Sequence, residues 1–178
     1  MNLYIVRHGQ TNYNVAGLHN ADPKVDVHLT DTGISEAKTI AERLKDIPFN
    51  AIYVSELPRT RQTADIINEF HQIPIHIDAR LNDINSGFEG LPVSDYHLLR
   101  DNSPDPFTYR YPGAESSEDV YHRTEEFLKD LKPQDYHDVL IVTSKHNFRH
   151  FHSIINHLNP RTSLKNPSKN AEILIRKI

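Results

Sequence analysis

The sequence predicts an α/β layer fold with a mainly parallel sheet. Two observations lead to this prediction: short apolar runs of strand type recur along the chain, and segments with helical spacing lie between them. Such alternation is typical of helices packed on a parallel sheet. The 178 residues, 37% of them hydrophobic, can build one core. We therefore expect a single domain over 1–178.

The predicted strands share short length and a high content of β-branched and aromatic residues. They are "LYIV" (3–6), "AIYV" (51–54), "IHI" (75–77), "DVLIVT" (138–143) and "EILI" (172–175).

Four helices are predicted from apolar residues that recur every three to four positions. Their ranges are 34–47, a stretch beginning near 57, 120–131 and about 146–158. Thr30 is the expected N-cap of the first helix, and Ser116 with Asp119 resembles a capping box before the third. The segment 82–115 is rich in Gly, Pro, Asn, Asp and Ser, and we expect a long excursion over one end of the sheet.

Composition excludes several classes of protein. The formal net charge is −4 with both signs mixed, which argues against nucleic-acid binding. The absence of cysteine excludes disulfides, thiolate catalysis and cysteine-ligated zinc. No apolar run is long enough to span a bilayer, and we find no signal-peptide pattern at the N-terminus. We therefore expect a cytoplasmic protein that binds neither nucleic acid nor membrane.

Polar side chains follow four of the predicted strands. They are Arg7 and His8 after the first strand, Ser55 to Arg59 after the second, Asp83 after the third, and Ser144, Lys145 and His146 after the fourth. Ligands of parallel sheets bind beyond the carboxyl ends of the strands. We therefore expect these segments to converge on one site.

This set of residues suits an anionic, phosphorylated substrate. The guanidinium groups of Arg7 and Arg59 match phosphate oxygens and could stabilise charge on them. A neutral imidazole such as His8 is a competent nucleophile towards phosphorus, and Asp83 is the nearest acid that could protonate a leaving oxygen. The scheme requires no metal cofactor.

Several motifs, in order and at matching spacing, resemble the histidine phosphatase superfamily, also called phosphoglycerate mutase-like, over nearly the whole chain. The first motif carries His8, with Arg7 and Asn14 at phosphate-contacting positions, and the third carries Arg59. The motifs are "VRHGQTNYN", "DVHLTDTGISEAKTIAERL", "VSELPRTRQTA", "LNDINSGFEGL" and "YPGAESSEDVYHR".

The resemblance implies a three-layer α-β-α sandwich and phosphoryl transfer through a phosphohistidine on His8, without a metal. The compact chain leaves little room for the lid that shields a phosphoenzyme from water in a mutase. We therefore expect a hydrolase of a small phosphomonoester rather than a phosphoglycerate mutase. A sugar phosphate, a carboxylated phosphate and a nucleotide all remain open, and the sequence does not indicate an oligomeric state.

The chain departs from the family pattern at the second histidine. In "VLIVTSKHNFR", the position five residues before Arg149 is Ser144, and His146 comes two residues later. Either His146 enters the pocket, which we favour, or Ser144 or Lys145 donates to the phosphoryl oxygens instead.

Two further departures concern the acid and the pocket mouth. Asp83 stands where many members carry glutamate, and Glu89 on the same excursion is the alternative acid. In "AGLHNADPKVD", Leu18 and Ala21 replace the arginine and glycine typical of the family, and the spacing to Asp26 is longer. Substrate contacts at the pocket mouth therefore differ from the pattern.

Two rival interpretations remain. His146 and His150 are four residues apart on a predicted helix with His152 close by, which is a possible zinc-binding arrangement without an evident acidic ligand. Alternatively, the displaced histidine marks a pseudophosphatase that binds phosphorylated ligands without turnover. The remaining histidines lack motif context and are interpreted as surface or packing residues; they include His71, His76, His97 and His157.

Overall fold

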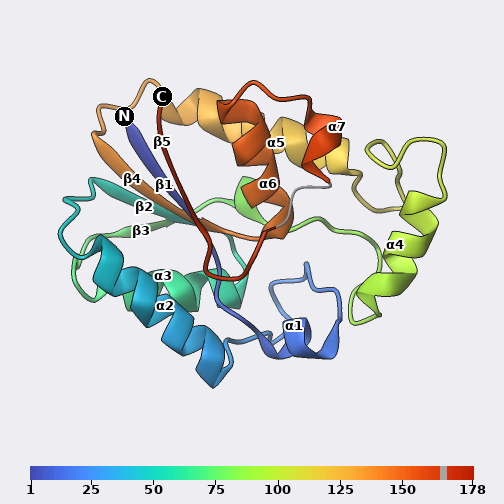
Figure 1. The fold of residues 1–178 in the computed structure, drawn as a ribbon, viewed down its shortest axis with the longest axis horizontal. Helices are drawn as coiled ribbons and strands as arrows, with labels where there is room; N and C mark the ends of the chain where they lie inside the picture. Colours follow the sequence, from blue (N-terminus) through green and yellow to red (C-terminus); the bar gives the residue numbers. More distant parts are fainter. Residues whose placement is uncertain (165–167) are drawn as a thin grey trace.

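The computed structural model describes residues 1–164 and 168–178 and contains a five-stranded sheet (Figure 1). The strands are β1 (Asn2–Arg7), β2 (Ala51–Val54), β3 (Ile75–Ile77), β4 (Asp138–Thr143) and β5 (Ile173–Lys177). Their order is β3-β2-β4-β1-β5. All neighbours pair in parallel except β5, which pairs antiparallel with β1. The mainly parallel sheet is confirmed.

Helices cover both faces of this sheet, so the three-layer sandwich is confirmed (Figure 1). One face carries α2 (Asp31–Leu44) and α3 (Pro58–Asn68), and the other carries α5 (Ser117–Leu131) and α6 (Lys145–Ile155). The shorter helices are α1 (Asn12–Ala16), the 3₁₀ turn η1 (Ala79–Leu81), α4 (Val93–Asp101) and α7 (Pro160–Ser163).

Alternation along β1 divides the core into two layers. Leu3 and Ile5 pack in the cluster that includes residues of α5 and α6, whereas Tyr4 and Val6 pack in the cluster that includes residues of α2 and α3. Successive side chains of a strand point to opposite faces. A run of four apolar residues is therefore required because both faces of β1 are covered.

The helix starts follow the predicted local signals. The Thr30 side chain accepts a hydrogen bond from the Gly33 amide, and Ser116 with Asp119 forms a complete capping box. Helix α3 begins at Pro58, directly after Leu57. The predicted excursion 82–115 contains a helix that the sequence did not indicate, α4, which lies beyond the end of the sheet (Figure 1).

The parallel strands bring the residues after Arg7, Val54, Ile77 and Thr143 to one edge of the sheet. The segment before β5 returns to the same edge, where the Ala171 amide donates to the His8 carbonyl at 3.2 Å. This edge is where the polar residues predicted from the sequence converge. Among the described helices, none has the length and apolar character that crossing a membrane requires.

Candidate active site

A cavity of about 310 Å³ opens at the carboxyl edge of the sheet. The predicted residues that line it are Arg7, His8, Asn14, Arg59, Asp83 and His146, together with Lys145, which the sequence left as an alternative. Ser144 does not line the cavity. The volume of the cavity suits a small ligand.

His8 is 2% exposed and both of its ring nitrogens have partners. Nδ1 lies 2.8 Å from the Gly9 carbonyl oxygen, which can only accept, so Nδ1 carries the proton. Nε2 therefore holds the lone pair and accepts from Arg59 Nε at 3.0 Å. Burial, and next the charges of Arg59 and Arg7, hold the pKa of His8 well below its ordinary value. His8 is thus a neutral imidazole with a defined tautomer at neutral pH.

The loop after His8 packs against α2 through close contact between Gly9 and Gly33. A Cβ atom at Gly9 would lie 3.0 Å from the carbonyl carbon of Gly33 and still closer to its oxygen. The Gly9 amide also donates to Thr63 Oγ1 on α3 at 3.2 Å. The backbone that orients His8 therefore rests directly on α2 and α3.

Arg59 is 3% exposed and uses its whole guanidinium group. Besides His8, it donates through NH1 to Asn20 Oδ1 and through NH2 to the Asn20 carbonyl at 3.0 Å. NH2 also lies 3.3 Å from Ser144 Oγ and 3.5 Å from Asp83 Oδ2. Ser144 thus accepts a hydrogen bond from Arg59 and lies outside the cavity lining. A direct contact of Ser144 with a substrate stays a prediction.

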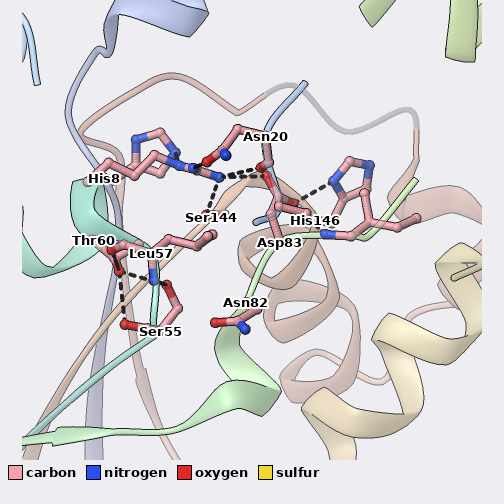
Figure 2. A network of polar contacts seen from close by, with 12 residues as sticks. His8, Asn20, Ser55, Leu57, Thr60, Asn82, Asp83, Ser144 and His146 are labelled. Atoms are coloured by element: carbon pink, nitrogen blue, oxygen red, sulfur yellow. Dashed lines mark hydrogen bonds and ion pairs between the residues drawn. The ribbon is translucent and has the colours of Figure 1, made fainter. Parts of the chain in front are cut away.

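The first turn of α3, which carries Arg59, is fixed by the hydroxyl groups of Ser55 and Thr60, both shown in Figure 2. Ser55 Oγ accepts from the Leu57 amide at 3.3 Å and lies 2.6 Å from Thr60 Oγ1. Thr60 Oγ1 in turn donates to the Leu57 carbonyl at 2.8 Å. These buried bonds replace a side-chain cap, which Leu57 cannot provide, and they hold the backbone that carries Arg59.

Asp83 and His146 form a close pair. His146 Nδ1 lies 2.8 Å from Asp83 Oδ1, and Asp83 lies between the His8 and His146 rings in Figure 2. Burial acts to raise the pKa of Asp83, but His146, Arg59 and the Ile84 amide outweigh it and hold that pKa well below its ordinary value. A hydrogen-bonded chain therefore links His8, Arg59, Asp83 and His146.

The cavity carries an excess of positive charge. Its described lining includes the cations Arg7, Arg59 and Lys145 but only one carboxylate, Asp83. Burial, and next the charges of Arg149 and Arg7, lower the pKa of Lys145 to about 8. Such a field attracts an anionic ligand.

Arg7 and Asn14 are both tied to the segment before β5. Arg7 NH1 donates to the Ser168 carbonyl at 2.7 Å, while its buried Nε has no hydrogen-bond partner among the described residues. Asn14 Oδ1 accepts from Asn170 Nδ2 at 3.0 Å, and the same nitrogen lies 3.2 Å from the His8 carbonyl. Asn14 thus lines the cavity with its side-chain oxygen already bonded.

Several lining residues were missed or misinterpreted in the sequence, among them Asn20, Asn170 and His97. Asn20 and Asn170 hold Arg59 and His8, and no local pattern marks either residue. His97, interpreted as a surface or packing residue, lines the cavity from α4, and burial lowers its pKa to about 4. The alternative acid, Glu89, is outside the lining, where it accepts from Asn20 Nδ2 at 2.8 Å and from the amide of Ala21 at 2.6 Å.

The histidines of the zinc alternative point to different partners. His146 contacts Asp83, whereas Nε2 of His150 lies 3.1 Å from Ser117 Oγ in the core. In residues 1–164 and 168–178, no group of three or more His, Asp or Glu side chains could hold a metal ion. The described residues therefore do not form the zinc site considered from the sequence.

A family model described as the histidine phosphatase superfamily, branch 1, matches residues 3–178. The solved structure of YhfR from Bacillus stearothermophilus superposes with a TM-score of 0.88 and 25% identity, covering 99% of this chain and 91% of that one.

Two curated proteins illustrate the sequence similarity. The adenosylcobalamin/alpha-ribazole phosphatase of Salmonella typhimurium is 41% identical over 87 residues, 49% of this chain and 42% of that protein. A probable fructose-2,6-bisphosphatase, TIGAR A of Danio rerio, is 32% identical over 135 residues, 72% of this chain and 52% of that protein. The chain thus matches about half the length of these relatives.

Proposed function

The chain belongs to branch 1 of the histidine phosphatase superfamily, and on this premise we propose that it hydrolyses a small phosphomonoester through a phosphohistidine on His8. The observation that carries the proposal is the state of His8. The Gly9 carbonyl accepts from Nδ1–H, so Nε2 carries the lone pair. His8 lines a cavity that the cations Arg7, Arg59 and Lys145 also line. A neutral, oriented imidazole is the nucleophile that a phosphohistidine intermediate requires.

In the first step, Nε2 of His8 bonds to phosphorus while the bond from phosphorus to the ester oxygen breaks. The entering phosphoryl oxygens take over the N–H groups of Arg59, including the Nε–H that donates to the His8 lone pair in this structure. Arg7 and Lys145 add positive charge where negative charge develops. The leaving oxygen takes a proton from the Asp83–His146 pair.

In the second step, water attacks the phosphohistidine, the bond between phosphorus and Nε2 breaks, and inorganic phosphate leaves. A cavity of about 310 Å³ supports a small leaving group. The names of the relatives include phosphatases of alpha-ribazole and fructose phosphates, so sugar phosphates come first in a substrate screen.

The test is hydrolysis of p-nitrophenyl phosphate in EDTA by the unaltered protein and by His8→Ala. We expect metal-independent turnover that falls about a thousand-fold or more in the variant. His76→Ala, which removes an exposed histidine of β3, is the matched control and should keep full activity. An undiminished rate in His8→Ala would overturn the proposal.

One observation favours a second candidate, a phosphate-binding protein without turnover. Position 144, where the family pattern has its second histidine, holds a buried serine bonded to Arg59. In that case, phosphate or vanadate would raise the melting temperature of the unaltered protein, and no phosphohistidine would form with any of the screened esters.

A further inference from the structure

The Asp83 carboxylate is occupied on both oxygens. Oδ1 accepts from His146 Nδ1 at 2.8 Å and from the Ile84 amide at 3.0 Å, and Oδ2 faces Arg59 NH2 at 3.5 Å. Three donors stabilise the ionised form, in agreement with a pKa held well below the ordinary value against the effect of burial. Asp83 is therefore an acceptor in this site and holds no proton that it could donate.

His146 has the opposite character. An ionised carboxylate can only accept, so Nδ1 of His146 carries a proton and donates it to Asp83. His146 is 6% exposed and lines the cavity, and because Nδ1 is bonded to Asp83, Nε2 is the ring nitrogen that remains available to a ligand. An imidazole held in this way by a carboxylate has one nitrogen oriented for proton transfer.

We propose that His146 donates the proton that the leaving oxygen receives and that Asp83 is the positioning residue of His146. Asp83 is then not itself the acid. This inference rests on the proposed function. It also differs from the role of phosphoryl-oxygen donor that the family pattern suggests for a second histidine.

The proton balance closes over one turnover. As the bond between phosphorus and the ester oxygen breaks, that oxygen takes the proton from Nε2 of the His146 imidazolium, which becomes a neutral imidazole. As water then attacks the phosphohistidine, Nε2 of His146 takes a proton from the water, and inorganic phosphate leaves. The imidazolium is restored for the next substrate.

The charged surroundings of His146 make its protonation depend on the ligand. The titratable and charged groups around it are Asp83, Lys145, Arg149, His19, His97 and His150. Burial, with Arg149 and Lys145, lowers the pKa of His146, and Asp83 opposes this. A bound phosphoryl dianion adds negative charge beside the ring, so the imidazolium forms when the substrate is present.

The experiment compares single-turnover release of the leaving group from two substrates. p-Nitrophenyl phosphate needs no proton on its leaving oxygen, whereas glycerol phosphate needs one. In His146→Gln, the amide can still donate to Asp83 but carries no transferable proton. We expect its rate with glycerol phosphate to fall about 10²- to 10⁴-fold, and its rate with p-nitrophenyl phosphate to fall less than about ten-fold.

Asp83→Asn tests the positioning role. The amide oxygen that this substitution introduces can accept from Nδ1 of His146 but cannot stabilise an imidazolium by charge. We expect a smaller loss with glycerol phosphate than in His146→Gln, and an alkaline limb of the pH profile that moves to lower pH. His152→Gln, on the same helix but outside the cavity lining, is the control and should change neither rate. If His146→Gln does not fold, His146→Asn takes its place.

Two outcomes would overturn this inference. Equal losses with both substrates in His146→Gln would mean that His146 only contacts the phosphoryl oxygens. A larger loss in Asp83→Asn than in His146→Gln, with the alkaline limb of the pH profile unmoved in His146→Gln, would make Asp83 the acid itself. The proposed function fails separately, because it requires that a phosphoenzyme forms from p-nitrophenyl phosphate in the unaltered protein and not in His8→Ala.

Discussion

Gly33→Ala should disturb catalysis although residue 33 lies outside the cavity lining. A Cβ atom there would lie 2.8 Å from the Gln10 nitrogen and 2.9 Å from its carbonyl carbon, with the carbonyl oxygen closer still. Ordinary contact begins at 3.4 Å, so the Gln10 nitrogen would have to move by about 0.6 Å, the difference between 3.4 and 2.8 Å, and the closer carbonyl oxygen by more.

That movement has a cost because the Gln10 peptide is held on several sides. Its amide donates to Glu36 Oε2 at 2.7 Å, and its carbonyl accepts from the Thr30 amide at 3.0 Å. Overpacking of this kind lowers the free energy of unfolding by about 1–3 kcal/mol. Since Gln10 is two residues from His8, a displacement approaching 1 Å at the nucleophile should also lower kcat by about a hundred-fold.

The assays are urea denaturation and hydrolysis of p-nitrophenyl phosphate, with Ser35→Ala as the control. Ser35 is an exposed residue of the same helix, so its replacement should change the free energy of unfolding by less than about 0.5 kcal/mol and leave kcat unchanged. A Gly33→Ala protein with unchanged urea midpoint and unchanged kcat would refute the inference that the contact between the loop after His8 and α2 positions His8.

Two further predictions concern the loop beside Arg59 and the buried histidines. Glu89→Gln weakens the bonds that Glu89 accepts from Asn20, Ala21 and Asp22. KM should therefore rise a few-fold, while the pH profile of activity keeps its position. Loss of an ionisation from that profile would instead identify Glu89 as the acid. Burial lowers the pKa of His150 from 6.5 to about 3, so the unfolded chain binds a proton that the folded chain does not. The free energy of unfolding is therefore not reduced by this histidine above pH 6.5, and below pH 6.5 it should fall by up to about 1.4 kcal/mol per pH unit. Urea midpoints that stay equal at pH 7.5, 5.5 and 4.5 would contradict this.

Local signals explain what could be predicted of the fold. The caps Thr30 and Ser116 and the fully apolar run of β1 each specify a structure within a few residues, and each was predicted. Helix α4 has no such signal: Pro92 precedes it without a side-chain cap, and Leu98 and Leu99 remain exposed. Its periodicity therefore does not mark a buried face.

The predicted part of the site follows from topology. His8 directly follows β1, and Arg59 and His146 lie in the first turns of the helices that follow β2 and β4. Asp83 follows the short turn η1 beyond β3, so the parallel sheet brings all four residues together. Asn20 and Asn170 could not be predicted in this way. Their roles arise from contacts between loops that are far apart in the sequence, and such contacts have no periodic pattern.

The bonds between the start of the chain and the segment before β5 have a consequence for biosynthesis. Arg7 and His8 are held by Ser168, Asn170 and Ala171, which a ribosome adds about 160 residues later. Until those residues emerge, the His8 carbonyl and the Arg7 side chain lack these partners, although β1 itself has long been made. Closing such distant contacts is slow, so the nucleophile acquires its final environment only after residues 168–171 have been made and have docked.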